Sequence, residues 1–460
     1  DLIEDNLGVL WTRADETKGL VYDELEEATI AKVDYREKSP FTTRGFLFGN
    51  ERTNALMVAR NKCNIAGYVA DLGLVGSDCH HTVPWILTGS PIYDPEEPEY
   101  WETDEEGNCL WQEGSLQLNP FSDKTADAVA AYFIAQMEAD PNNRFGFIGE
   151  EDTRGHGRCV PWDTEPFEYA PGEFVQPDDA NYYSTVFFTM VNKIARKVKE
   201  AIPDAIIGTF ICRLGQEIPS CAIEDNVMIC YACADEDYTV SILDSSISEH
   251  TNNYSANTHW KNIPFWAENA CTVTMYHYYL CNCFGTEFSW PIWDRIQADL
   301  KGYVTLGIDG VTTDGLPDLN QGSAWLDCYG AAGTCSNYWD MNELLCWLYQ
   351  KLIWNPDEDI PSLITYFCDK VYGEASPYMQ EYFRLMKQGF EEGSQQRHEL
   401  VSLILHKSSY YRTYVKKTGI GHPVLDALEQ AYNAAEGPVK DTIKYIWDTV
   451  SANMNMFRSF

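Results

Sequence analysis

The sequence predicts an α/β protein whose main part is a (β/α)8 TIM barrel, with a short N-terminal lead-in and a C-terminal helical domain. Strand-like and helix-like segments alternate along most of the 460 residues, which is typical of a parallel sheet with crossover helices. From residue 360 onward the spacing of apolar residues is almost purely helical. The chain is also long enough for a barrel, which takes about 250 residues, together with an added domain.

The barrel is expected over 42–354, between a lead-in or remnant of a β-rich module at 1–41 and the helical domain at 355–460. Short apolar runs bounded by turn residues predict the barrel strands. These strands cover 42–49, 64–72, 80–87, 145–149, 205–212, 227–233, 271–280 and 303–313. Apolar residues at helical spacing predict the helices between them. The clearest helices cover 51–62, 123–139, 180–201, 291–300 and 337–353.

A long acidic and aromatic insertion at 88–118 interrupts this alternation. Loops that follow barrel strands open on the face that carries catalysis, so we expect the insertion to form part of a substrate cleft. The expected lining consists of its aromatic residues and one that precedes it: Trp85, Tyr93, Tyr100, Trp101 and Trp111.

The charge of the chain excludes some classes of partner. The formal net charge is −37, and such a surface repels phosphate backbones, so no nucleic-acid partner is expected. No apolar run of about 18 residues exists, so we expect no membrane insertion. The first residues lack the basic and apolar regions of a signal peptide. This fits a cytosolic chain or a secreted chain without its signal, and the prediction slightly favours a secreted or cell-surface location.

The 15 cysteines show neither a disulfide framework nor the spacing of a structural zinc site. The close pairs Cys230 with Cys233 and Cys281 with Cys283 each lack a second pair. We therefore expect no metal and no cofactor, and the sequence leaves the oligomeric state open.

Three consecutive acids follow the predicted strand 145–149: Glu150, Glu151 and Asp152. Catalytic residues of TIM barrels lie where a strand ends and its loop begins. Neighbouring carboxylates near a pocket raise the pKa of at least one of them, and a protonated acid beside an ionised one suits the protonation of a glycosidic oxygen. These acids are the candidate catalytic residues.

Other polar and aromatic residues near predicted strand ends are candidates for binding substrate. A histidine there can hold a sugar hydroxyl, and an aromatic ring can stack on the apolar face of a sugar. The candidates are Arg44, His80, His81, Trp85, Tyr278, Asp314, Trp325 and Trp339. Period-two alternation sends about half of residues 276–279 into the barrel. Glu268 precedes a predicted strand, so we expect it to be structural.

Several of these motifs together resemble a known family. The motifs are RGFLF at 44–48, ARNKCN at 59–64, HHT at 80–82, EED at 150–152, MVNKIARKV at 190–198 and LIWNPDEDI at 352–360. They resemble the bacterial domain of unknown function 4838, over about residues 42–390, and relatives in glycoside hydrolase family 163. In that pattern the acid pair after the fourth strand falls on Glu151 and Asp152, and a Gly-His-Thr signature falls on 80–82, with His80 in place of the glycine.

The resemblance implies a TIM-barrel enzyme that hydrolyses N-acetylglucosaminides, including endo-cleavage within N-glycans. One hypothesis is a retaining enzyme in which the acetamide of the substrate acts as nucleophile, because adjacent acids suit that scheme. A second is a glycosidase for another sugar, with Glu151 paired to Glu268 or Asp314. A third is a non-catalytic glycan-binding barrel. In each case the partner is an oligosaccharide.

Overall fold

The computed structural model describes most of the chain. The described residues are 2–13, 17–30, 36–46, 52–65, 81–106, 108–109, 117–151, 159, 162–211, 215, 217–232, 237–244, 261–280, 288–313, 335–395 and 407–457.

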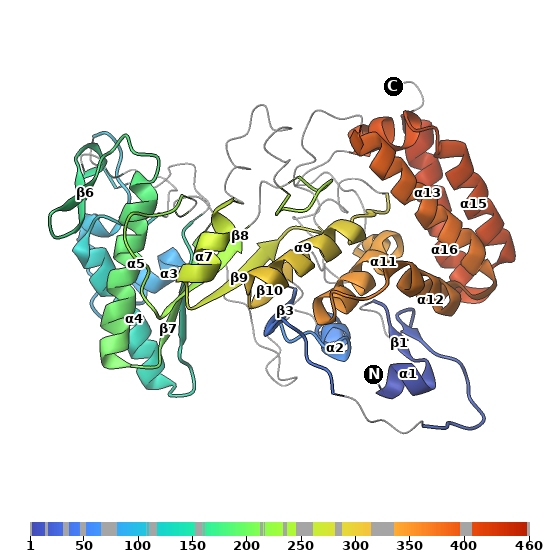
Figure 1. Cartoon of the computed structure of the whole chain (residues 1–460), viewed down its shortest axis with the longest axis horizontal. Helices are drawn as coiled ribbons and strands as arrows, with labels where there is room; N and C mark the ends of the chain where they lie inside the picture. The colour runs from blue at the N-terminus through green and yellow to red at the C-terminus, as the bar shows by residue number, and fades with distance from the viewer. Residues whose placement is uncertain are drawn as a thin grey trace.

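A parallel six-stranded sheet forms the centre of the α/β fold (Figure 1). Its order is β3-β10-β9-β8-β7-β4. The strands are β3 (Thr43–Phe46), β4 (Phe145–Ile148), β7 (Ile206–Ile211), β8 (Val227–Ala232), β9 (Thr272–His277) and β10 (Gly310–Thr313). The first of these strands in the sequence, β3, pairs with the last, β10, and Ile65 forms a parallel bridge to Gly45 on β3. The described sheet is therefore a parallel half-barrel that includes the seam between first and last strands.

Helices alternate with these strands along the chain, as the sequence predicts. They are α2 (Arg52–Arg60), α3 (Val83–Thr88), α4 (Asp123–Ala139), α5 (Tyr182–Ala201), α7 (Ile263–Asn269), α9 (Trp293–Leu306) and α11 (Cys335–Trp354). Helices α4 and α5 pack side by side at one end of the molecule, and α9 contacts α11 nearer its middle (Figure 1). Ser122 caps α4 by accepting a hydrogen bond from Lys124 N.

Among the described residues, small antiparallel hairpins and short 3-10 helices lie outside the central sheet and these helices. They are β1 (Leu10–Trp11) with β2 (Leu20–Val21), β5 (Phe167–Ala170) with β6 (Glu173–Val175), η2 (Pro98–Tyr100), η4 (Trp162–Thr164) and η6 (Gly373–Ala375). The first hairpin follows α1 (Leu2–Leu7). Its neighbour Arg13 forms buried ion pairs with Asp340 and Glu343 on α11. These ion pairs thus attach the N-terminal lead-in to α11.

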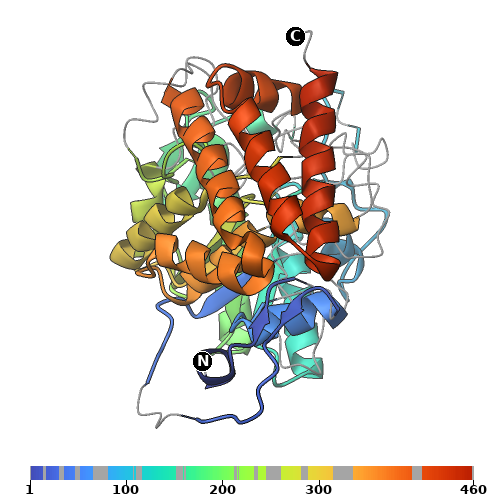
Figure 2. The same ribbon diagram turned by 90° about the vertical axis from the view of Figure 1, so that its right-hand side faces the viewer.

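The C-terminal segment is helical, as predicted, and its helices lie side by side (Figure 2, orange to red). They are α12 (Ile360–Tyr372), α13 (Ser376–Gln395), α14 (Lys407–Tyr410), the π-helix η7 (Tyr411–Lys416), α15 (Gly421–Ala434) and α16 (Gly437–Met456). Tyr410 donates a hydrogen bond to the carbonyl of Ser289, 2.9 Å away, and its ring stacks on Phe288. These contacts belong to a continuous apolar core that includes residues of both the sheet and the C-terminal helices.

The structure contradicts two strand predictions. The predicted strand 80–87 is wrong in its second half, because Val83–Thr88 is the helix α3, with a proline in its first turn. Proline there is compatible with a helix start, although the surrounding Val, Trp and Ile residues favour a strand. The predicted strand 303–313 is wrong in its first part, because α9 continues to Leu306 and ends at Gly307, whose φ is 76°. Tertiary packing of Tyr303, which is fully buried, extends that helix.

The two faces of the sheet carry different residues. Phe147, Phe210, Cys230, Ala232 and Tyr276 form a compact apolar cluster on one face, with Phe145 and Tyr278 packed against it. The opposite face carries residues such as Ile148, Ile229 and Met275, which belong to the large core that includes the helices. The compact cluster therefore marks the inner face of the half-barrel.

Candidate active site

Glu150 and Glu151, which follow β4, lie at the carboxyl end of the sheet. Phe145 and Phe147 face inward, whereas a side chain at Gly146 would meet Phe133 on α4. If this alternation continues past the strand, Glu151 lies on the inner side and Glu150 on the opposite side. Glu150 is fully buried, and Glu151 is partly exposed. Glu151 is therefore better placed than Glu150 to meet a ligand.

The segment that begins α3 fixes the end of β4. Thr82 N donates to the carbonyl of Gly149 (3.2 Å), and the Thr82 hydroxyl accepts from Gly149 N (2.9 Å) and donates to the carbonyl of Phe147 (3.1 Å). The His81 ring nitrogen Nδ1 contacts the carbonyl of Glu150. Because these bonds join residues 65–69 positions apart in the chain, they set where Glu150 and Glu151 leave the sheet.

The carboxylate of Glu151 has a specific partner in this segment. Its Oε1 atom accepts a hydrogen bond of 3.2 Å from Val83 N in the first turn of α3. The site can thus orient a carboxylate and bring it into contact with a ligand at the carboxyl end of the sheet.

Aromatic rings connect this corner to the rest of the inner face. The His81 ring lies 5.8 Å from the Phe210 ring, Phe210 lies 6.1 Å from Tyr276, and Tyr276 lies 4.8 Å from Tyr278. The candidates His81 and Tyr278 are therefore linked through Tyr276 and through Phe210, which was not singled out from the sequence. Trp85, on α3, is 58% exposed and can present its ring to a ligand.

Arg44 does not join these residues. Its guanidinium donates to the carbonyls of Phe41 and Lys62 and lies over the Trp354 ring, 5.3 Å from its centroid. Phe41 and Lys62 precede the strand and the bridge at Ile65, so these contacts lie at the amino end of the sheet. Burial lowers the pKa of Arg44, but the group stays cationic. The proposal that Arg44 binds substrate is contradicted by this placement.

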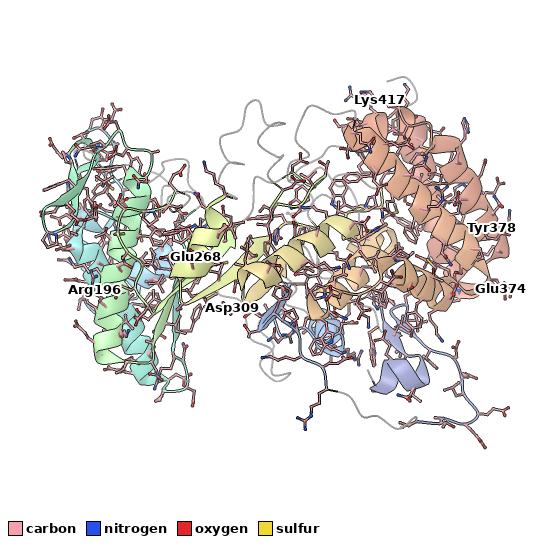
Figure 3. The ribbon with its side chains drawn as sticks, in the orientation of Figure 1. Arg196, Glu268, Asp309, Glu374, Tyr378 and Lys417 are labelled. Carbon is pink, nitrogen blue, oxygen red and sulfur yellow. The ribbon has the colours of Figure 1, made fainter. Side chains whose placement is uncertain are left out.

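Two acids away from β4 also lie toward the amino end (Figure 3). Glu268 is exposed on α7, the helix that precedes β9. Asp309 precedes β10, and its carboxylate accepts hydrogen bonds from the Thr272 hydroxyl (2.7 Å) and Val273 N (3.2 Å). Both are structural or surface residues by position, which agrees with the expectation for Glu268.

The insertion contributes differently from what the sequence predicts. Tyr100 and Trp101 are 4% and 2% exposed, so their rings cannot stack on a sugar. Tyr93 stacks on Tyr100, with ring centroids 5.4 Å apart. Tyr100 and Trp101 belong to the large apolar core, and Tyr93 packs against it. The described part of the insertion approaches the site instead through Gln117, which hydrogen-bonds the backbone of Glu151.

Several predicted residues lie outside the described ones: Asp152, His80, Asp314, Trp325 and Trp111. Trp339 lies on α11, and its side chain is also outside what the structure describes. Among the residues missed from the sequence, Phe147 could have been found from strand alternation, since it stands two positions before Gly149. Gln117 and Phe210 carry no comparable signal.

The described ranges contain no cluster of three or more His, Cys, Asp or Glu side chains suited to a metal ion. Burial raises the pKa of Cys63 to about 12, so this thiol stays protonated. Within those ranges no helix has the length and apolar character needed to cross a bilayer.

A groove of about 510 Å³ lies away from these residues. Its lining includes Glu4, Glu37, Lys62, Lys351 and Trp354. The lining pairs with itself: Lys62 lies 3.4 Å from Glu37, Trp354 Nε1 donates to Glu37 (3.2 Å), and Lys351 is bonded to Glu4. The groove therefore lies between the N-terminal lead-in and α11, whose side chains pair across it, and it is separate from Glu150 and Glu151.

Comparison with solved structures finds two glycoside hydrolases among the similar chains. One is a family 138 enzyme that targets pectin rhamnogalacturonan II, with 10% identity over 93% of this chain and a TM-score of 0.41. The other is a family 89 glycoside hydrolase from Clostridium perfringens in complex with 2-acetamido-1,2-dideoxynojirimycin, with 10% identity over 99% of this chain and a TM-score of 0.46. This chain spans 58% of the length of each.

Comparison with curated protein sequences finds no match. The family model described as domain of unknown function DUF4838 matches residues 16–384. This match covers most of the chain, and it agrees with the resemblance carried by the motifs around Arg44, Glu151 and Trp354. The chain belongs to the DUF4838 family.

Proposed function

We propose that this protein is a glycoside hydrolase that acts on N-acetylglucosaminide linkages of complex glycans, with its acids after β4 as the catalytic groups. The observation that carries the proposal is the placement of Glu151. Its carboxylate is oriented by Val83 N at the carboxyl end of a parallel sheet, next to an inner face lined by aromatic rings. Catalytic groups of barrel enzymes occupy that end of the sheet.

We also propose that the sheet is part of a complete barrel. A complete (β/α)8 barrel over 42–354 would place 64–72 next to β3 and close the sheet between β3 and β4. The parallel bridge from Ile65 to Gly45 supports this closure. The lead-in over 1–41 and the helical domain over 355–460 would pack against the barrel, as the ion pairs of Arg13 and the contacts of Tyr410 suggest.

In the proposed mechanism Glu151 is the general acid. It donates its proton to the glycosidic oxygen while the acetamide oxygen of the substrate attacks the anomeric carbon, and the bond to the leaving sugar breaks. Asp152 would hold the acetamide N–H and stabilise the positive charge of the cyclic intermediate. Water then opens that intermediate, and Glu151 accepts the proton from this water. The product retains the anomeric configuration.

In the two-carboxylate alternative, the position of Glu268 argues against it as the partner of Glu151. An exposed residue on α7, ahead of β9, is not at the end of the sheet where Glu151 lies. Asp314 is therefore the partner that this alternative retains.

A panel of defined glycans with mass-spectrometric detection of released sugars tests the proposal. Release of products that end in N-acetylglucosamine, blocked by an N-acetylglucosamine-thiazoline, is the expected result. Asp152→Asn should lose activity on natural and activated substrates alike. Cleavage that the thiazoline does not inhibit would replace substrate assistance by the two-carboxylate scheme. No cleavage of any glycan would contradict the proposed function.

A further inference from the structure

Gln117 is a nearly fully buried amide, 2% exposed, in the last part of the insertion. Its Nε2 atom donates to the carbonyl of Glu151 (3.2 Å), and its Oε1 atom accepts from Glu151 N (3.4 Å). One side chain therefore occupies both backbone groups of a single residue, as the peptide of a neighbouring strand would. Glu151 lies three residues beyond Ile148, the last residue of β4 that pairs with β7.

Neighbouring residues of the insertion hold Gln117 in place. The Gln117 carbonyl accepts a hydrogen bond from Glu102 N (3.0 Å), and the Gln117 Oε1 atom also accepts one from Leu118 N (3.3 Å). Trp101 forms an antiparallel bridge with Leu118. The buried rings of Tyr100 and Trp101 thus support the pairing of residues 101–102 with residues 117–118. Such support makes the amide of Gln117 a fixed reference point rather than an adaptable surface group.

We propose that Gln117 is a positioning residue for the acid Glu151, and that delivering this amide is a main task of the insertion. The inference rests on the proposed function, since it takes Glu151 as the general acid. Gln117 holds the backbone of Glu151, and Val83 N holds its carboxylate. Two fixed points leave the carboxylate little freedom to rotate away from the glycosidic oxygen.

The chemistry of the side chain explains why an amide stands here. The carbonyl and the N–H of one residue need one donor and one acceptor, and a glutamine side chain offers both. Leucine has a similar size and offers neither. A displacement of about 1 Å at a catalytic group can cost about 10²-fold in rate.

The test compares Gln117→Leu with Gln350→Leu. Gln350 is a matched control because it is also fully buried, it donates to the carbonyl of Cys346 (3.1 Å), and it lies on α11. The kinetics of both variants would be measured on a natural glycan and on an activated aryl glycoside, with thermal unfolding as a check of folding.

We expect Gln117→Leu to lose about 10- to 100-fold in kcat on the natural glycan, with KM little changed, because the acid is misplaced. The loss on the aryl glycoside should be far smaller, and the limb of the pH–rate profile that reports the acid should move. Gln350→Leu should keep the wild-type kcat and profile. Equal kcat and equal pH profiles for the two variants would overturn the role of Gln117.

A second measurement separates this inference from the proposed function. The Glu151 carboxyl carbon can be followed by NMR during a pH titration and identified by its loss in Glu151→Gln. Gln117→Leu should shift its titration midpoint, and Gln350→Leu should not. If the wild type cleaves no glycan but the midpoint shifts, the function is wrong and the positioning role stands. An unchanged midpoint in Gln117→Leu would contradict the positioning role whether or not the protein is active.

Discussion

Aromatic residues at the end of β9 and just beyond it point to both sides of the sheet, and the two sets have different surroundings. Tyr276 and Tyr278 face inward, in the cluster that continues to Phe210 and the His81 ring. His277 and Tyr279 face outward and are fully buried against α9. The four residues are consecutive in the sequence, so only their direction separates a candidate substrate surface from the structural core.

The outward face forms a buried polar network. His277 Nε2 lies 2.8 Å from the Tyr303 hydroxyl, and its ring stacks on Tyr279 with centroids 4.1 Å apart. The Tyr279 hydroxyl donates to Asp299 (2.8 Å), which also forms an ion pair with Arg295 (3.1 Å). Asp299 accepts from Ile242 N as well (2.8 Å). Polar groups committed to one another in this way stabilise the fold and leave little for a ligand.

The largest effect is expected from breaking this network. Asp299→Ala should lower the free energy of unfolding by about 3–5 kcal/mol, because Arg295 would keep its buried charge without that partner. Asp294→Ala is the control on the same helix. Its ion pair with Lys387 is half exposed, and such pairs contribute about 0–1 kcal/mol. Urea unfolding measures both. Equal losses would show that the outward network does not stabilise the fold.

A smaller effect is expected at the histidine. His277→Phe keeps the aromatic stacking but removes the hydrogen bond to the Tyr303 hydroxyl. Losing that bond in a buried site should cost about 1–3 kcal/mol of unfolding free energy. KM for a glycan should not change, because His277 faces the helices. A large rise in KM at wild-type stability would place His277 in the substrate site. It would contradict the division between inward substrate-facing residues and outward structural residues.

The inward face should behave in the opposite way. Tyr278→Ala should raise KM roughly tenfold, which corresponds to about 1.4 kcal/mol of lost binding, because the ring is expected to contact the substrate. The melting temperature should fall less than in His277→Phe, since Tyr278 is only partly buried. A wild-type KM together with a large loss of stability would show that Tyr278 belongs to the core.

Local patterns predicted much of the fold, and long-range contacts explain most of what they missed. The helix 123–139 was predicted with the bounds that the structure gives, because its apolar spacing and the acidic residue at its start are local signals. The strand predicted over 80–87 failed because Val, Trp and Ile in a short run do not distinguish a strand from a helix. The proline in the first turn of α3 is compatible with the start of a helix.

The candidate site shows the same division. Glu151 could be placed from the sequence because a strand end is a local feature. Gln117 could not, because its bonds to Glu151 span 34 residues. Arg44 was misplaced because the sequence does not tell which way its side chain leaves β3. Its alternate neighbour Phe46 packs on Tyr349 of α11, so Arg44 shares the outward face.

The general-acid role of Glu151 is tested most directly by Glu151→Gln, with Glu268→Gln as the matched control on the exposed face of α7. On a natural glycan we predict that Glu151→Gln loses about 10²–10⁴-fold in kcat. The loss on an activated aryl glycoside should be far smaller, because its leaving group departs without a proton. Glu268→Gln should match the wild type on both substrates. Full activity of Glu151→Gln on the natural glycan would contradict the assignment of the catalytic acid to the end of β4.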